Sequence, residues 1–445
     1  MFSRPGLSWL VTLVFLAVVD IGLGFIAPFL SLVVGALIVA PITAMRPQLT
    51  LVLAIPFLML PIVFEVAGIS VQFPIAAAIG LGLLLAFWRR TRTLIPLVIL
   101  GLVASALLTA SLIFHERIVV ADSTAQNGLI ALLICLGMVF AVALARPNVI
   151  PLLVSIAASG AVVSTYGLIF GALSVTNRLE SEQLNANGTG HVAAIAVISA
   201  ISLAWATKEA WWLLLSGPSV VVLSMAHSRA AFIVLAVGLG ALVIASMRSK
   251  ARYLLSAALT VLVFISVWTP AQEFVSRLFT AGRSEAAAES STSQRLVLSD
   301  LAMCLVQSHP LFGIGYRAFP DHSYEIFHVG FNTHNDYLRI AVEAGLPTLI
   351  IVVLIGLGAT FWTSRSWKFR PVVLPIVAAT ATSFLYGNTM ALLSLSFPMW
   401  VLLGVLWSRY SSGSVLLWFR QLKSRVFERR RGPGPHDNGH HDTTA

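Results

Sequence analysis

Residues 346–363 read LPTLIIVVLIGLGATFWT and contain no charged side chain. A helix that spans a bilayer needs about 20 mainly apolar residues, so this stretch predicts a transmembrane segment. Similar apolar runs recur from the N-terminus to about Leu406. Over the whole chain 58% of the residues are hydrophobic and 10% are charged, whereas soluble domains carry about 25% charged residues. The sequence therefore predicts an all-α fold, a polytopic transmembrane helical bundle.

The predicted spans are apolar runs separated by short polar or glycine-containing gaps. They number about 14, and 12 is the alternative because several of them are short. The first run is interpreted as a span and not as a signal peptide, since another apolar run follows it at once. The spans lie approximately at 7–22, 24–45, 49–69, 71–88, 94–114, 127–145, 149–173, 190–207, 210–226, 228–247, 251–269, 346–363, 371–388 and 391–408.

Basic residues predict the orientation of the spans. The gaps after even-numbered spans contain Arg46, Arg89, Arg90, Arg92, Arg146, Lys208, Arg248, Lys250, Arg252, Arg365, Lys368 and Arg370. The short gaps after odd-numbered spans contain only Arg117, Arg178 and Arg229. Because positive charge accumulates in cytoplasmic loops, both termini are predicted inside and the long segment after the eleventh span outside.

The pattern divides the chain into four parts. Residues 1–269 form the N-terminal spans, 270–345 a large extracytoplasmic loop, 346–410 the C-terminal spans, and 411–445 a basic tail. The tail is predicted to be amphipathic at first and disordered further on. The net charge of +10 is explained by these gaps and the tail, so nucleic acid is not an expected partner. No CxxC or His/Cys cluster indicates a metal site.

The loop contains two predicted helices. Residues 294–308 have an apolar stripe with helical spacing, while 281–293, rich in Ala, Ser and Glu, are predicted to be flexible. The turn LFGIG at 311–315 requires the backbone freedom of glycine. A second helix opens at 333–337, with Asn335 or Asp336 as its cap, and stops at Gly345.

The order of the loop motifs carries a resemblance. Arg295 is followed by SHPLFGIG at 308–315, THNDYL at 333–338 and EAGL at 343–346. This order resembles the O-antigen ligase and polysaccharide polymerase superfamily of bacterial inner membranes. Upstream, LNANG at 184–188 resembles the family's Asn-rich segment, and HSRAA at 227–231 resembles its Ser-Arg-small motif. The motifs cover roughly residues 170 to 405.

The resemblance implies a membrane glycosyltransferase of the inner membrane, without metal or other cofactor. Its donor would be a glycan on an undecaprenyl pyrophosphate carrier, used on the periplasmic face. The acceptor stays open: lipid A core for a lipopolysaccharide ligase, a growing chain for an O-antigen or exopolysaccharide polymerase, or protein for an O-glycosyltransferase.

The chemistry of such a transfer predicts three catalytic residues. Arg229 and Arg295 would hold the phosphates and stabilise charge on the departing oxygen, because a guanidinium binds phosphate bidentately. His334 would activate the incoming hydroxyl. Plainer roles compete: Arg229 could snorkel to headgroups, and Arg295 could be a surface residue. Further substrate-binding residues, with ion pairing, helix capping or interfacial anchoring as alternatives, are Arg178, Asn187, His191, Asn335 and Tyr337.

The alternative function is a transporter or flippase of lipid-linked glycans. Transporters place ionisable residues near the middle of the membrane, whereas the candidates here, Asp20 and Glu65, fall near predicted span ends. A receptor-like outer domain is the weaker option, since the loop is short and tied to the membrane. The concentration of polar motifs on one side favours the transferase.

Overall fold

The computed structural model describes residues 28–59, 65–66, 69–70, 72–87, 95–113, 123–173, 178–180, 186–247, 285–316, 318–363, 370–387 and 393–408. The chain divides into two units, Met1–Arg409 and Tyr410–Ala445, and every described residue belongs to the first. The predicted spans at 7–22 and 251–269, Asp20 and the tail at 411–445 lie outside the described residues.

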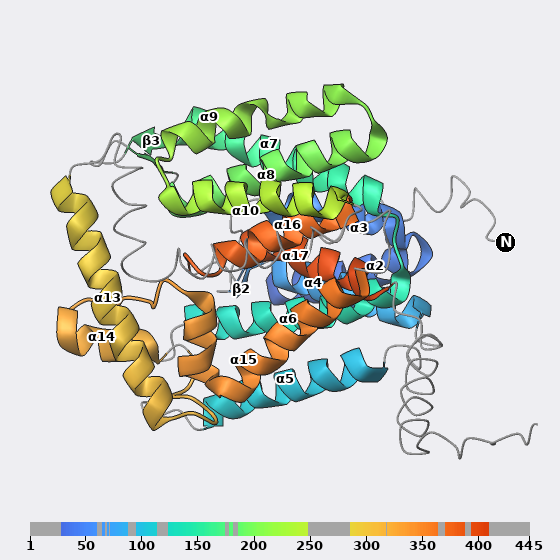
Figure 1. The fold of residues 1–445 in the computed structure, drawn as a ribbon. Coiled ribbons are helices and arrows are strands. Elements are labelled where there is room, and N and C mark those ends of the chain that lie inside the picture. Colours follow the sequence, from blue (N-terminus) through green and yellow to red (C-terminus); the bar gives the residue numbers. More distant parts are fainter. Residues whose placement is uncertain are drawn as a thin grey trace, which may run out of the picture. The chain divides into compact units, whose positions relative to one another are not determined.

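The described residues are almost entirely helical (Figure 1). The helices that precede the large loop are α2 (Pro28–Met45), α3 (Pro47–Met59), α4 (Gln72–Phe87), α5 (Ile95–Ile113), α6 (Ser123–Ala145), α7 (Val149–Phe170), α8 (Ala186–Thr207), the 3-10 helix η2 (Ala210–Ser216), α9 (Gly217–Met225) and α10 (Arg229–Ser246). Those that follow are α13 (Glu285–Ser308), α14 (Phe319–Phe327), α15 (Asp336–Thr363), α16 (Arg370–Ser383) and α17 (Leu393–Trp407). Two short antiparallel hairpins pair β1 (Glu65–Val66) with β2 (Ile69–Ser70) and β3 (Ala172–Leu173) with β4 (Leu179–Glu180).

Twelve of the predicted spans fall on described residues, and each overlaps a helical element. The predicted span at 49–69 extends too far, because α3 ends at Met59 and Glu65–Val66 form β1. Within the described residues four helices are long and apolar enough to cross a bilayer: Val149–Phe170, Ala186–Thr207, Arg229–Ser246 and Asp336–Ala359. The others are shorter apolar helices. The predicted all-α membrane fold is therefore confirmed.

The predicted span at 210–226 consists of the 3-10 helix η2 joined to α9, and Pro218 lies at their junction. Two other local expectations were wrong. Helix α13 begins at Glu285, inside the segment expected to be flexible, since alanine and glutamate favour helix. A third loop helix, α14, occupies part of the polar stretch for which no helix was predicted.

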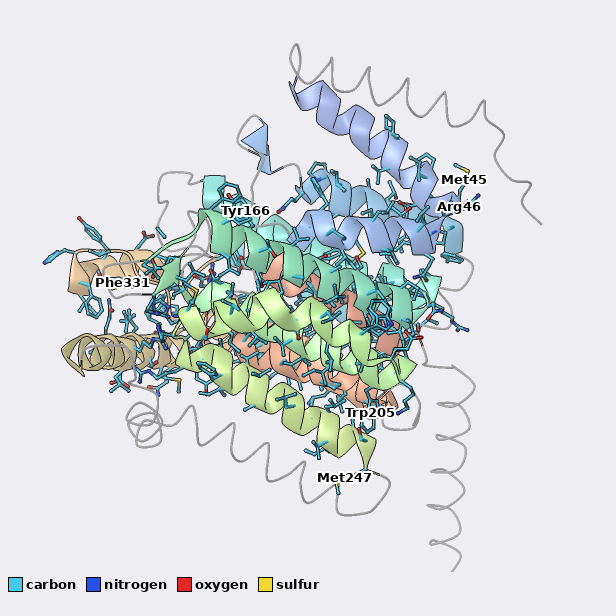
Figure 2. All side chains as sticks on the ribbon, turned by 90° about the horizontal axis from the view of Figure 1, so that it is seen from above. Met45, Arg46, Tyr166, Trp205, Met247 and Phe331 are labelled. Carbon is cyan, nitrogen blue, oxygen red and sulfur yellow. The ribbon has the colours of Figure 1, made fainter. Side chains whose placement is uncertain are left out.

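Helix α8 lies at the centre of the described bundle and packs against α7, α9, α10 and α16. Figure 2 shows Arg46, Trp205 and Met247 towards the end of the bundle that is remote from Phe331 in the loop. The predicted basic gaps next to these three residues thus lie at one end of the bundle, and the polar loop lies at the other end. Which end faces the cytoplasm remains a prediction.

Two loop motifs interlock through their backbones. Gly345 leaves the helical conformation, with φ 83° and ψ 160°, and divides α15 at the predicted stop. The amides of Ile314 and Gly315 donate to the carbonyls of Val342 and Glu343 at 2.8 and 3.2 Å. The Leu346 amide donates to the Pro310 carbonyl at 2.9 Å. These three backbone hydrogen bonds, which we call the clasp, hold the SHPLFGIG segment against the kink of α15 at Gly345.

Helix α13 rests on this clasp through its apolar stripe. Leu298, Ala302 and Val306 are buried together with Ile314 and Val342 in one cluster. Three residues of the predicted stripe, Leu301, Leu305 and Leu296, are only partly buried. The stripe places one face of α13 against α15, so the loop helices form a fixed part of the described structure.

Replacement of Gly345 by alanine is expected to destabilise the protein. A Cβ at this position would collide with the Leu311 carbonyl, and its φ and ψ are accessible essentially only to glycine. We expect a loss of at least about 2 kcal/mol, measured as a lower unfolding temperature in detergent. Gly356→Ala is the matched control, because a Cβ there meets no atom within 4 Å. Equal unfolding temperatures in the two variants would contradict the clasp.

Candidate functional site

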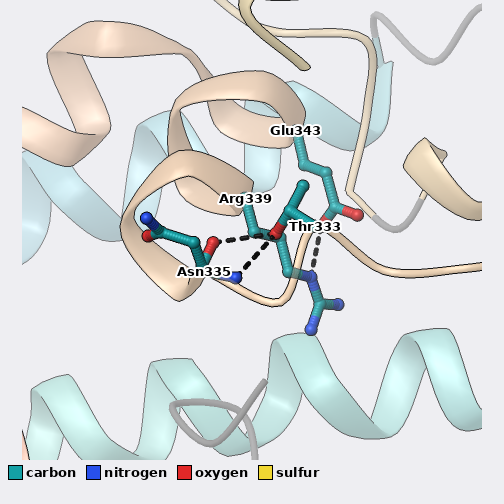
Figure 3. Close-up of polar contacts among 4 residues, drawn as sticks. All are labelled: Thr333, Asn335, Arg339 and Glu343. Carbon is teal, nitrogen blue, oxygen red and sulfur yellow. Dashed lines mark hydrogen bonds and ion pairs between the residues drawn. The ribbon is translucent and has the colours of Figure 1, made fainter. Parts of the chain in front are cut away.

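His334 is held at the start of α15 by the residues on either side of it. The Asn335 side chain accepts hydrogen bonds from the amides of Tyr337 and Leu338, both at 3.1 Å, so Asn335 is the cap. The Thr333 hydroxyl donates to the Asn335 carbonyl at 2.8 Å (Figure 3). Between these two residues the backbone of His334 is left-handed, with φ 54°. The imidazole is therefore carried by a fixed turn and not by a loose loop.

The start of α15 is fastened to the end of α16. The Asp336 amide donates to the Phe384 carbonyl at 2.7 Å, and the Tyr337 hydroxyl donates to the Ala381 carbonyl at 3.0 Å. The Tyr337 ring also contacts the Phe384 ring edge-on. Asn335 and Tyr337, both predicted to bind substrate, thus have structural partners that position His334.

A second polar network joins the starts of α8 and α10. The Arg178 guanidinium is buried; its Nε donates to the Ala226 carbonyl at 3.0 Å and its Nη2 to the Asn187 side chain at 2.8 Å. The same Asn187 oxygen accepts from the Ser228 hydroxyl at 2.9 Å. Arg178 and Asn187, predicted separately from the sequence, are therefore direct partners.

Arg229 is the first residue of α10, directly after this network. The Ser228 hydroxyl caps the helix by accepting from the Ala231 amide at 3.3 Å. A side chain on Gly190 of α8 would contact Ala231 and Ser228, so the two helix starts approach closely. The Ser-Arg-small motif thus supplies a cap, a cation and a small packing residue.

Arg295 on α13 links the two predicted histidines. Its charge acts on both His191 in α8 and His334 before α15, so the guanidinium lies near both rings. His191 is one helical turn beyond Asn187 and shares its face of α8. Arg178 therefore bonds Asn187, Asn187 is one turn from His191, and Arg295 is close to both His191 and His334.

The environment of His334 keeps its imidazole neutral. Burial, and then the positive charge of Arg295, lower the pKa of His334 to about 4. A neutral imidazole can accept a proton or a hydrogen bond at pH 7. The ring is therefore available as a base, although a weaker one than an exposed histidine of pKa about 6.5.

This pKa predicts a pH dependence of stability. Between about pH 6.5 and 4 the unfolded chain binds a proton at His334 that the folded chain does not bind. The stability is fully present above pH 6.5 and is lost as the pH falls towards 4. We expect the unfolding temperature to fall more between pH 7 and 4.5 in the wild type than in His334→Gln. Parallel curves would contradict the lowered pKa.

A buried ion pair under the site was not predicted from the sequence. Arg339 Nε and Glu343 Oε2 are 3.0 Å apart within α15, and both side chains are buried (Figure 3). The Arg339 guanidinium also lies over the Tyr316 ring, 5.5 Å from its centre. The signal was available, because a basic and an acidic residue four positions apart share one helix face. The pair joins the His334 helix to the EAGL motif.

Glu343→Ala is expected to be among the most destabilising changes at this end of the bundle. It leaves a buried guanidinium without its carboxylate, which costs about 3–5 kcal/mol. The measurement is the unfolding temperature and the yield of monodisperse protein. The double variant Arg339→Met/Glu343→Leu is the control and should recover much of the loss, since no buried charge remains. An intact Glu343→Ala protein would show that the pair is dispensable.

One family of known proteins matches part of the chain. Residues 213–353 match the model of a family described as O-antigen ligase. The matched range contains Arg229, Arg295 and His334 and ends within α15. No curated protein matches the chain. In the described residues no group of three or more His, Cys, Asp or Glu side chains is placed to hold a metal ion. Over residues 213–353 the chain is thus similar to the O-antigen ligase family, which supports a membrane protein of the glycan ligase and polymerase class.

Proposed function

We propose that this protein transfers a glycan from an undecaprenyl pyrophosphate carrier to an acceptor hydroxyl on the periplasmic face of the bacterial inner membrane. The observation that carries the proposal is the placement of Arg295 near both His191 and His334. Two of these three residues, Arg295 and His334, lie in the range that matches the O-antigen ligase family. The carrier, the membrane and its face are proposals that extend the family match.

In the proposed reaction the acceptor oxygen forms a bond to the anomeric carbon of the donor sugar. The bond from that carbon to the phosphate oxygen breaks, and the electron pair leaves with the diphosphate. Arg295 and Arg229 stabilise this negative charge, because guanidinium groups bind phosphate oxygens through paired N–H donors. His334 takes the proton of the acceptor hydroxyl.

Donor and base are coupled in this arrangement. Burial, and then the charge of Arg295, lower the pKa of His334 to about 4 in the free protein. A diphosphate next to Arg295 would offset that charge and raise the basicity of the imidazole. His334 would then be a stronger base with the donor in place than in the free protein, although burial still lowers its pKa.

The proposal is tested by deletion of the gene in its own host, followed by analysis of the surface polysaccharide. Loss of lipopolysaccharide-bound chains indicates a ligase, and short unpolymerised repeats indicate a polymerase. Loss of glycan from a protein indicates an O-glycosyltransferase. Purified protein with lipid-linked donor and the matching acceptor should then form product. An unchanged surface profile together with no product in vitro would refute the proposal.

A further inference from the structure

His191 is a completely buried polar side chain that has no hydrogen-bond partner within the described part of the chain. Its exposed fraction is 0%, and neither Nδ1 nor Nε2 has a hydrogen-bond partner among the described residues. A buried polar group left unpaired costs free energy, whereas an apolar side chain of similar size would not. The position is therefore unfavourable in the free protein, and it favours a partner that the described residues do not supply.

The nearby Asn187 side chain already accepts hydrogen bonds from other residues. One turn earlier on α8, the Asn187 oxygen accepts from both Arg178 and Ser228. Gly190, next to His191, brings α8 against the start of α10, where an added Cβ would contact Ala231 and Ser228. The Asn187 side chain in the first turn of α8 therefore has its partners within the protein, whereas the His191 ring one turn later has none among the described residues.

The charge nearby indicates the chemistry of the missing partner. Arg295 is close enough for its charge to act on His191, and Arg178 bonds the residue one turn away. An anion between these groups would be attracted by the guanidinium and could accept the N–H of a neutral imidazole. A phosphate oxygen meets both requirements.

We infer that His191 donates a hydrogen bond from its ring to a phosphate oxygen of the lipid-linked donor, next to Arg295. The inference rests on the proposed function and makes His191 a residue that binds the leaving diphosphate. His334 handles the acceptor proton. The two histidines thus serve opposite sides of one reaction, with Arg295 near both.

The test measures binding of undecaprenyl pyrophosphate to the full-length protein in nanodiscs. His191→Leu removes both ring nitrogens and is expected to raise the Kd about 10- to 100-fold, as for loss of a hydrogen bond to a charged group. His191→Gln keeps an N–H donor and should lie between His191→Leu and the wild type. Ser202→Ala is the matched control, since Ser202 in α8 is also buried and has no hydrogen-bond partner among the residues that the structure describes. Its Kd should equal that of the wild type.

Inorganic pyrophosphate and undecaprenol, as separate probes, locate the contact. Weaker pyrophosphate binding in His191→Leu supports the phosphate contact, and weakening confined to undecaprenol overturns it. The unfolding temperature without ligand should not fall in His191→Leu. A fall in both His191 variants with unchanged Kd would make His191 a packing residue. Failure of the wild type to bind undecaprenyl pyrophosphate refutes the proposed function, whereas equal binding by wild type and His191→Leu refutes only this inference.

Discussion

His334→Asn is expected to lower glycan transfer by about a thousandfold while the protein stays folded. Asparagine tolerates the left-handed backbone of this position, with φ 54°, so the change removes the base and keeps the turn. Loss of a general base accounts for about 100- to 10,000-fold in rate. His334→Ala should also abolish transfer, with some additional strain. The measurement is single-turnover transfer from saturating lipid-linked donor.

His328→Asn provides the matched control for His334. His328 lies in the same loop, is exposed, and has an almost identical left-handed backbone, with φ 55°. It forms the C-terminal cap of α14. Its replacement should leave transfer within about twofold of the wild type. A wild-type glycan profile in cells that carry His334→Asn would remove His334 from the mechanism.

Arg295→Ala is expected to reduce transfer about 100- to 1000-fold, as loss of a group that stabilises the leaving oxygen does. The loss should appear in both kcat and the KM for the donor, because the guanidinium binds the diphosphate before and during its departure. Arg295→Lys should restore only part of the rate, since an ammonium lacks the paired donors of the guanidinium. Transfer is measured at several donor concentrations.

The control for Arg295 is Asp300→Ala on the exposed face of the same helix. It tests whether changes on α13 disturb the loop in general, and we expect normal transfer. A normal KM and kcat in Arg295→Ala would show that Arg295 is a surface residue without a role in transfer. In that case the effect of its charge on His334 would have no role in catalysis.

The bundle was predictable because the bilayer imposes a simple rule on sequence. Apolar length alone located the helices before and after the large loop, α2 to α10 and α15 to α17, within the described residues. The rule fails where length and hydrophobicity do not specify the type of helix, as in η2. It also fails in the loop, where α14 is a short helix whose residues carry no long apolar pattern.

The candidate site was predictable in part. The order of the motifs indicated Arg295 and His334, and the structure brings the two residues close together. Two features depend on tertiary contacts and could not be read from the sequence: the missing partners of His191, and the pairing of the SHPLFGIG and EAGL backbones. The Arg339–Glu343 pair, by contrast, was visible in the spacing and was overlooked.

The clasp at Gly345 has a consequence for how such proteins diverge. Its hydrogen bonds join only main-chain atoms, and the side chains of Leu311 and Phe312 between them are exposed. Mutation can therefore alter these side chains, and with them the surface near the site, without breaking the link that fixes the histidine helix. Glycines 313 and 345 should stay constant during evolution while their neighbours drift, so that one catalytic frame can adapt to new acceptors.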